Sequence, residues 1–272
     1  MTASREMGFW DHAEVLRGVL LRVAAVVFVL MIAFFAAMPY IFDNVILAPC
    51  RGDFVLYRWL ELLSGTGLLG SEGESVTDFS VNLINIQLAS QFFIHMTSSF
   101  WLALIFSFPV IIYLLWGFVA PGLYENEKRG VRSAFVAGNV MFFLGVSVGY
   151  FLVFPLTLRF LADYQLSAMI PNQISLDSYM DNFMVLILVM GIVFELPLLA
   201  WLLGKTGLVT RELFVKYRRH AVVALLVLAA VITPTGDPFT LMVVFLPVYL
   251  LWEVSAFTVP RSRKETDAVA LL

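Results

Sequence analysis

Charged residues and cysteine are scarce in this sequence, and each scarcity excludes a class of protein. Lys, Arg, Asp and Glu make up only 14% of the 272 residues, whereas a soluble domain carries about 25%. The net charge is −3, and no basic patch indicates a nucleic-acid partner. The single cysteine, Cys50, excludes an internal disulfide framework and any cysteine-rich metal site.

The sequence also lacks a recognisable catalytic set. Its three histidines, His12, His95 and His220, are far apart. There is no HExxH pair, no glycine-rich phosphate loop and no GxSxG motif. We therefore interpret each histidine as a packed or interfacial residue, and we expect neither an enzyme nor a bound cofactor or metal.

Apolar residues, in contrast, are in excess. They make up 61% of the chain, and the mean hydropathy is +0.90. A globule of this size cannot bury so much apolar surface, so lipid must be the solvent for much of it. The composition predicts an all-α integral membrane protein, a single transmembrane domain over 1–272 with no soluble catalytic domain.

Six hydrophobic segments are candidates for transmembrane helices, which need about 20 apolar residues each. The fifth is shorter than the others, and the six cover residues 18–38, 92–116, 134–158, 180–203, 221–233 and 239–259. The first is longer than the 7–15 apolar residues typical of a cleaved signal peptide, so we expect a retained span. We expect residues 9–17 before it to form an interfacial amphipathic helix.

The positions of Lys and Arg predict the orientation, because cytoplasmic loops carry an excess of both. They gather in the N-terminal tail, after the second and fourth segments, and in the C-terminal tail, so both termini should face the cytoplasm. A re-entrant hairpin of segments five and six would also leave the tail inside. The outer loop, 39–91, is long, and its residues 54–63 should form a surface helix. Cys50 within the loop should react with thiol reagents added from outside, unless burial under the loop masks it, in which case a cysteine placed at Glu72 is the alternative.

Glu195 is the clearest acid at membrane depth, where a charge costs at least about 2.5 kcal/mol on insertion scales. It precedes Pro197 in the fourth segment, where a proline is expected to bend the helix. Two interpretations stay open. Glu195 is either a structural residue, which bonds a neighbouring helix or stays protonated, or a polar docking point for a partner helix or a translocating segment.

Two further acids have simpler interpretations. Asp237 lies in a tight turn before the last segment and is expected to form the turn or to cap the helix that follows. Glu253 lies near the cytoplasmic end of that segment, where we expect it to pair with Arg261 or Arg263.

The stretch 116–129 is the most distinctive predicted loop, since it combines aromatic residues, a Pro-Gly break and acids. A carboxylate such as Glu127 can bind a guanidinium group in bidentate fashion, which selects Arg over Lys, and Phe118 could add a cation–π contact. Physical chemistry alone favours a simpler interpretation, in which Phe118 belongs to an interfacial aromatic belt and Glu127 pairs with Lys128 or Arg129.

Several ordered motifs across nearly the whole chain resemble TatC, the large multi-span component of the twin-arginine protein translocase. They are Trp10-Asp11-His12 through Leu16-Arg17, Phe108-Pro109-Val110-Ile111, Trp116 through Arg129, Tyr150 through Leu156, Phe194-Glu195-Leu196-Pro197, and Thr233-Pro234 with Asp237.

The resemblance implies a curved, cup-like array of six helices with the last two short. It implies binding of twin-arginine signal peptides by Phe118 and Glu127 together with the N-terminal region that holds His12, Glu14 and Arg17. The acid of that region is displaced by one residue from the family pattern, which rotates Glu14 by about 100° on a helix.

The resemblance further assigns Glu195 as the family's intramembrane acid, with Asp237 as a second polar contact, and Pro49 as a functional proline of the outer loop.

The resemblance also implies a function. The chain would be the core and signal-peptide receptor of a translocase that exports folded proteins across the cytoplasmic (inner) membrane. It would form homo-oligomers inside a hetero-complex with TatA- and TatB-type single-span subunits, driven by the proton-motive force. The alternatives are an ion-coupled secondary transporter that uses Glu195 and an intramembrane enzyme.

Overall fold

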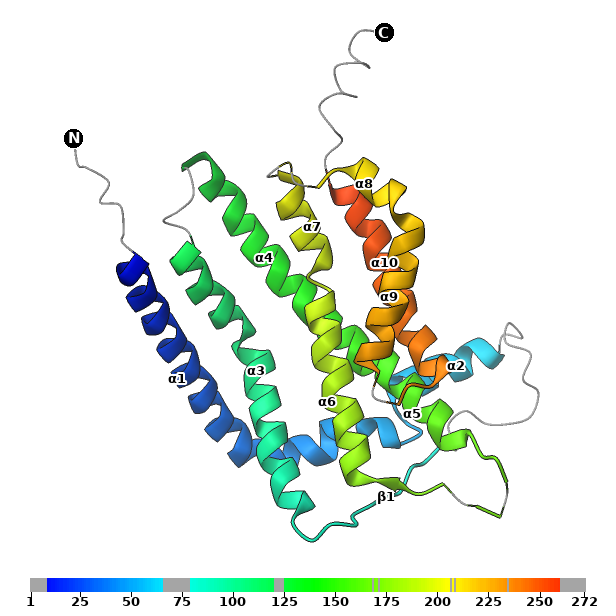
Figure 1. Ribbon diagram of the computed structural model, residues 1–272. Coiled ribbons are helices and arrows are strands. Elements are labelled where there is room, and N and C mark those ends of the chain that lie inside the picture. The colour runs from blue at the N-terminus through cyan, green and yellow to red at the C-terminus, as the bar shows by residue number, and fades with distance from the viewer. Residues whose placement is uncertain are drawn as a thin grey trace, which may run out of the picture. The chain divides into compact units, whose positions relative to one another are not determined.

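The computed structural model forms two compact units that are almost entirely helical (Figure 1). It describes residues 9–65, 79–119, 125–167, 169–170, 172–205, 207, 209–233 and 235–259. Unit 1 comprises Met1–Tyr40 and Phe92–Asn139, and unit 2 comprises Ile41–Gln91 and Val140–Leu272. The predicted all-helical class is confirmed, apart from two short strands, β1 (Leu83–Ile84) and β2 (Ile174–Ser175), which pair in parallel.

Unit 1 holds most of α1 (Phe9–Ile41) and α3 (Ser90–Val119) and the first part of α4 (Glu125–Val148). The imidazole Nε2 of His95 lies 2.9 Å from the Phe35 carbonyl oxygen, and its ring stacks on the Phe35 ring. His95 is thus a packed residue, as predicted. The helix predicted for residues 9–17 is confirmed as the first part of α1 and is continuous with the predicted span, since Gly18 leaves the helix intact and no proline precedes Pro39; its interfacial position stays a prediction.

Unit 2 extends α4 through a π-helical turn, η5 (Gly149–Val153), into α5 (Phe154–Asp163). Pro155 lies in the first turn of α5, where its missing N–H costs least and where the wider preceding turn accommodates its ring. The next element, α6 (Leu176–Val193), starts where the Ser175 side chain accepts a hydrogen bond from the Ser178 N–H. It is followed, after a break, by α7 (Leu196–Lys205).

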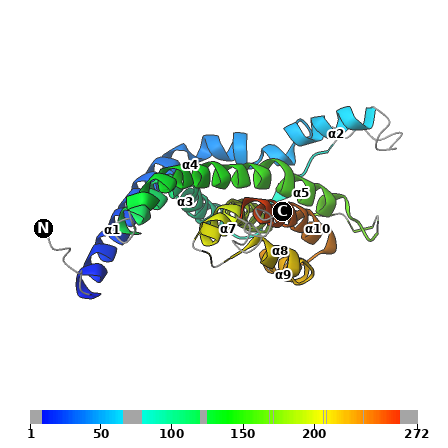
Figure 2. The ribbon, with the colours of Figure 1, turned by 90° about the horizontal axis from the view of Figure 1, so that it is seen from above.

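The C-terminal part of unit 2 contains α8 (Arg211–Lys216), α9 (Arg218–Ile232) and α10 (Pro238–Thr258). Viewed from above, these helices gather beside α7 and α5 (Figure 2). The ring of Phe160 in α5 stacks on that of Phe239 at the start of α10, with 4.1 Å between centroids. Phe214 of α8 packs on Trp252 of α10 at 4.5 Å.

The predicted outer loop, 39–91, contains more helix than the sequence indicated. Because α1 reaches Ile41, the loop begins with a π-helical turn, η1 (Phe42–Ile46), and a 3₁₀ turn, η2 (Ala48–Cys50). The surface helix predicted at 54–63 is α2 (Val55–Gly65). Cys50 is only 6% exposed, which is the burial that would mask its thiol, so labelling of this position from outside stays a prediction.

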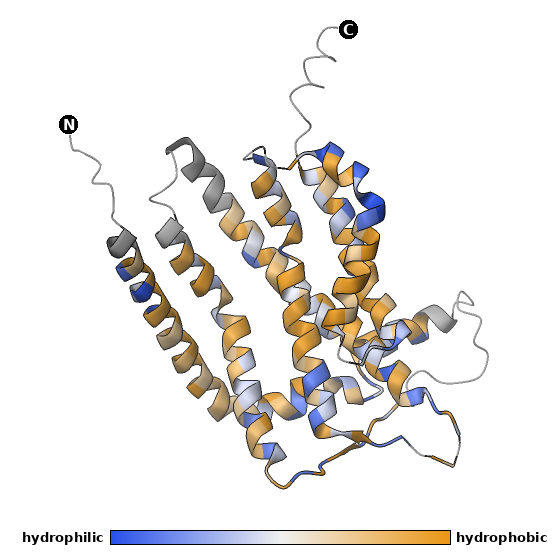
Figure 3. Cartoon of the chain, viewed as in Figure 1, coloured by the Kyte–Doolittle hydropathy of each residue, from blue (hydrophilic) through white to orange (hydrophobic). Residues whose placement is uncertain are grey.

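Five helical segments of the described residues are long and apolar enough to cross a membrane. They are Ala13–Cys50, Ser90–Leu115, Ala134–Asp163, Leu176–Lys205 and Pro238–Thr258. The helix at the predicted fifth segment, α9, has 15 residues, or about 22 Å at 1.5 Å per residue, which is short for a core of about 30 Å. Hydrophobic residues cover the helices, and hydrophilic ones gather near helix ends and in connections (Figure 3).

Candidate functional site

The residues predicted to bind a signal peptide all belong to unit 1. His12 lies in the first turn of α1, Phe118 in the last turn of α3 and Glu127 in the first turn of α4; their side chains lie outside the described ones. Glu14 and Arg17 are exposed and three residues apart on α1, which places them on one helical face.

The predicted loop over 116–129 was too long, because helix occupies both of its ends. Only residues 120–124, which are not described, separate the end of α3 from the start of α4. The Pro-Gly break predicted at positions 121–122 lies outside the described residues. Glu127 is thus in a helix's first turn, where the helix dipole favours an acid.

Glu195 lies at the break between α6 and α7, which explains its surroundings. The Glu195 N–H bonds to the Ile192 carbonyl at 3.0 Å, three residues back instead of four, so the helix tightens there. Pro197 has no N–H and so cannot donate the helical hydrogen bond to the Val193 carbonyl. The bend predicted at this proline is confirmed as the break between α6 and α7. The Oε1 atom of Glu195 is buried and has no hydrogen-bond partner among the described residues.

Two glycines allow α4 and α6 to pack closely just before this break. A Cβ atom added to Gly145 would lie 2.5 Å from the Met190 carbonyl oxygen and 2.7 Å from the Phe194 Cβ. One added to Gly191 would lie 2.8 Å from the Phe142 ring. Real Cβ atoms do not approach so closely, so only glycine fits either position.

Asp237 is the N-cap of α10, as the sequence predicted. One carboxylate oxygen accepts a hydrogen bond from the Thr240 N–H at 2.7 Å, and the other accepts one from the Thr235 hydroxyl at 2.6 Å. Partial burial acts to raise the pKa of Asp237, but these hydrogen bonds outweigh it and hold the pKa below its usual value. The carboxylate therefore stays ionised and is used to hold the turn.

Glu253 pairs differently from the prediction. Its Oε2 lies 2.6 Å from an Arg218 side-chain nitrogen, and its Oε1 accepts a hydrogen bond from the Tyr249 hydroxyl at 2.8 Å. The pair joins the start of α9 to the end of α10. The expected partners, Arg261 and Arg263, lie outside the described residues. The pair with Arg218 was missed because it lies across the hairpin, 35 positions away along the chain, and the contact with Arg261 or Arg263 stays a prediction.

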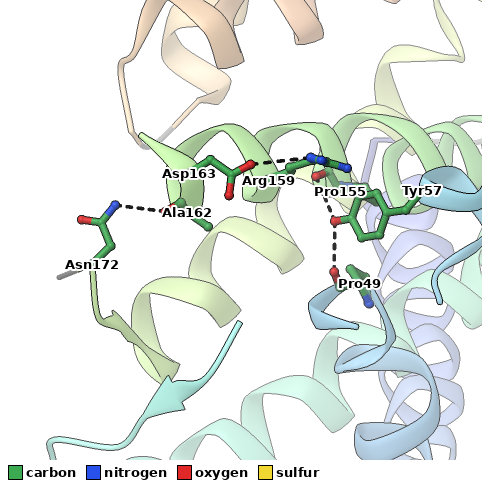
Figure 4. A network of polar contacts seen from close by, with 7 residues as sticks. All are labelled: Pro49, Tyr57, Pro155, Arg159, Ala162, Asp163 and Asn172. Atoms are coloured by element: carbon green, nitrogen blue, oxygen red, sulfur yellow. Dashed lines mark hydrogen bonds and ion pairs between the residues drawn. The ribbon is translucent and has the colours of Figure 1, made fainter. Parts of the chain in front are cut away.

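Pro49 takes part in a buried contact that joins the long loop to α5 (Figure 4). The hydroxyl of Tyr57, a side chain with 0% exposure, donates to the Pro49 carbonyl at 3.0 Å and shares its proton with the Pro155 carbonyl at 3.2 Å. Burial raises the pKa of Tyr57 strongly, although the charge of Arg159 acts in the opposite direction. The proline thus contributes its carbonyl oxygen, a role its ring does not predict.

The same cluster contains a cation and a helix cap. The Arg159 guanidinium lies 5.7 Å from the ring centroids of both Tyr57 and Phe79 and 3.6 Å from the Asp163 carboxylate (Figure 4). The Asn172 amide donates to carbonyls at the end of α5, including that of Ala162 at 3.2 Å. Sequence reasoning missed Tyr57 because only its place in an apolar segment was visible.

Comparison with known proteins decides the family. The family model described as Sec-independent protein translocase protein (TatC) matches residues 11–247. The chain belongs to the TatC family. It is 34% identical to the TatC of a Blattabacterium strain from Periplaneta americana over 93% of this chain and 94% of the relative. It is also 34% identical to the Deinococcus radiodurans TatC, over 66% and 67% of the two chains.

Solved structures agree with this assignment. A crystal structure described as the twin-arginine translocase receptor TatC superposes with a TM-score of 0.70 at 28% identity and covers 91% of this chain and 97% of that one. A second crystal structure of that receptor, in the detergent DDM, gives the same score and identity. This chain is therefore a multi-pass membrane component of the Sec-independent translocase and not an enzyme, which leaves the ion-coupled transporter without support.

Proposed function

We propose that this TatC-family chain is the membrane core and signal-peptide receptor of a translocase that exports folded proteins carrying twin-arginine signal peptides. One observation carries the proposal: the family match covers residues 11–247 and so includes every residue assigned to recognition. The solved relatives of the same fold are themselves described as receptors. The chemistry of the assigned residues, acids beside aromatics, suits guanidinium ligands.

The proposed arrangement has six spans, with α9 as a short fifth one, in a curved array with both termini in the cytoplasm. Lys and Arg in the loops after spans two and four support this orientation. In the cytoplasmic membrane the chain would form homo-oligomers and recruit TatA- and TatB-type single-span subunits, with Glu195 and Asp237 as polar contacts and Pro49 holding the outer loop. The proton-motive force would drive transport, with no cofactor.

In recognition, Glu127 would bind a signal-peptide arginine in bidentate geometry, with Phe118 against the same guanidinium. His12, Glu14 and Arg17 of α1 would complete the site. A partly desolvated pair contributes a few kcal/mol, whereas an exposed pair contributes about 1 kcal/mol at most. Because an ammonium cannot form the bidentate contact, the same residues would produce the preference for Arg-Arg over Lys-Lys.

The test is the affinity of purified protein for a twin-Arg peptide and for its twin-Lys counterpart, at low and moderate salt. We expect Glu127→Ala to weaken twin-Arg binding and to narrow the Arg/Lys preference. Glu125→Ala, two positions away on the same helix, is the matched control and should change both far less. Unchanged Arg/Lys discrimination in Glu127→Ala would refute this assignment and leave Glu127 paired with Lys128 or Arg129.

A further inference from the structure

A cavity of about 160 Å³ lies in unit 2 where α5, the segment leading into α6, and α6 meet. On the α5 side it is lined by Phe154, Thr157, Leu158 and Leu161, which recur at the spacing of one helical face. On the α6 side, Ser178 and Asn182 lie one turn apart and also line it. The cavity includes none of the residues assigned above to recognition or partner contact.

Two residues that line this cavity each carry a buried polar atom that lacks a hydrogen-bond partner among the described residues. Thr157 is 1% exposed, and its hydroxyl oxygen is unpaired. Asn182 donates its amide N–H to the Ser178 carbonyl at 2.8 Å, which leaves its buried Oδ1 unpaired. A threonine in a helix ordinarily bonds a carbonyl one turn back, as Thr233 does with Ala229 at 3.0 Å. A buried polar atom without a partner costs about 1–3 kcal/mol, so two at one cavity indicate a ligand.

The lining fixes the chemistry of that ligand. None of the residues around the cavity is charged: its polar members are threonine, serine, asparagine, glutamine and tyrosine. A charged group would therefore be desolvated there without a counter-charge. The Asn182 Oδ1 needs a donor, whereas the Thr157 hydroxyl can donate or accept. A carboxylate cannot donate to the Asn182 oxygen, and an ammonium would carry an uncompensated charge, whereas a neutral carboxamide or alcohol donates and accepts.

We propose that this cavity is a binding site for an uncharged hydrogen-bonding group, a carboxamide or a hydroxyl, held between the Thr157 hydroxyl and the Asn182 carboxamide oxygen. The site is independent of the Arg-Arg recognition described above, since it uses a different unit and neutral ligands. The exposed Ser178 marks its entrance.

The experiment places a cysteine at the entrance, Ser178→Cys, in the purified protein, with the parent protein giving the background from the buried Cys50. Methanethiosulfonate reagents with acetamide, propyl, trimethylammonium and sulfonate tails are compared by reaction rate. The matched control is Asp181→Cys, an exposed position of α6 that does not line the cavity. For each reagent, the rate at Ser178→Cys is divided by the rate at Asp181→Cys, which cancels the intrinsic reactivity of the reagent.

We expect the rate ratio of the acetamide reagent to be about fivefold higher than the rate ratios of the other three reagents. One net hydrogen bond of about 1 kcal/mol corresponds to this factor. Adding Thr157→Val should abolish this preference, and Thr157→Ser, which keeps the hydroxyl, should retain it. An equal ratio for all four tails, or an equally fast propyl reagent, would overturn the proposal. So would a preference that survives Thr157→Val.

Discussion

Removing the Tyr57 hydroxyl tests whether the polar cluster around Pro49 stabilises the protein. Tyr57→Phe keeps the ring against Phe54 and Phe79, at centroid distances of 5.8 and 5.2 Å, and deletes only the donor. The Pro155 carbonyl lies in the first turn of α5 and keeps its helical partner, but the Pro49 carbonyl loses its donor. A buried acceptor left unpaired costs about 1–3 kcal/mol, so the free energy of unfolding should fall by about 2 kcal/mol.

The chain contains its own reporter for this measurement. Cys50, its only cysteine, is 6% exposed and follows Pro49 in η2. A fluorogenic maleimide should therefore react slowly with the folded protein and quickly once heating opens this region. The unfolding midpoint of Tyr57→Phe should shift down by several degrees relative to the parent.

The matched control is Tyr164→Phe, which removes a hydroxyl from a side chain that is 62% exposed. Surface changes of this kind stay within about 0.5 kcal/mol, so its midpoint should equal that of the parent. If Tyr57→Phe and Tyr164→Phe unfold at the same temperature, the Tyr57–Pro49 hydrogen bond does not stabilise the loop and our energy estimate is wrong.

Three further predictions concern other parts of unit 2 and the same tyrosine. Gly145→Ala should destabilise the fold by about 1–3 kcal/mol through overpacking, while Gly18→Ala, with open space around it, should not; thermal unfolding of both variants decides. Glu195→Ala should leave the membrane level intact yet reduce export, and loss of the protein from the membrane would show instead that Glu195 holds the bundle. Burial raises the pKa of Tyr57 in the folded protein, whereas the pKa of a tyrosine in the unfolded chain is about 10. The free energy of unfolding should therefore be highest below about pH 10 and decline above it. An alkaline titration of stability should show a shallower decline for Tyr57→Phe.

Local signals predicted the elements whose cause lies within a few residues of chain. Apolar runs located the helices, and the Asp237 cap followed from its place before a helix start, since an aspartate there bonds the first free N–H groups. The bend at Glu195 followed from Pro197, which lacks the donor that an unbroken helix needs.

Contacts between distant segments were not predictable in the same way. The Arg218–Glu253 pair spans 35 positions and the Tyr57–Pro155 hydrogen bond spans 98. Nothing near Tyr57 in sequence distinguishes it from any other aromatic of an apolar helix. Such pairs depend on which helix faces meet, and a single sequence gives hydrophobic periodicity without the pairing of faces. The cavity beside Thr157 was missed for the same reason.

The packing around the α6–α7 break positions Glu195 through its neighbour Phe194. Phe194 is 5% exposed, and its Cβ lies where a side chain at Gly145 would need to be. Phe194 and Glu195 are adjacent at the break, so the contact of Phe194 with α4 positions the backbone that carries Glu195. Gly145 on α4 therefore orients Glu195, at the break after α6, indirectly through Phe194. A larger side chain at Gly145 should move Phe194 and with it the Glu195 carboxylate. Export should therefore fall by more than the loss of folded protein alone explains.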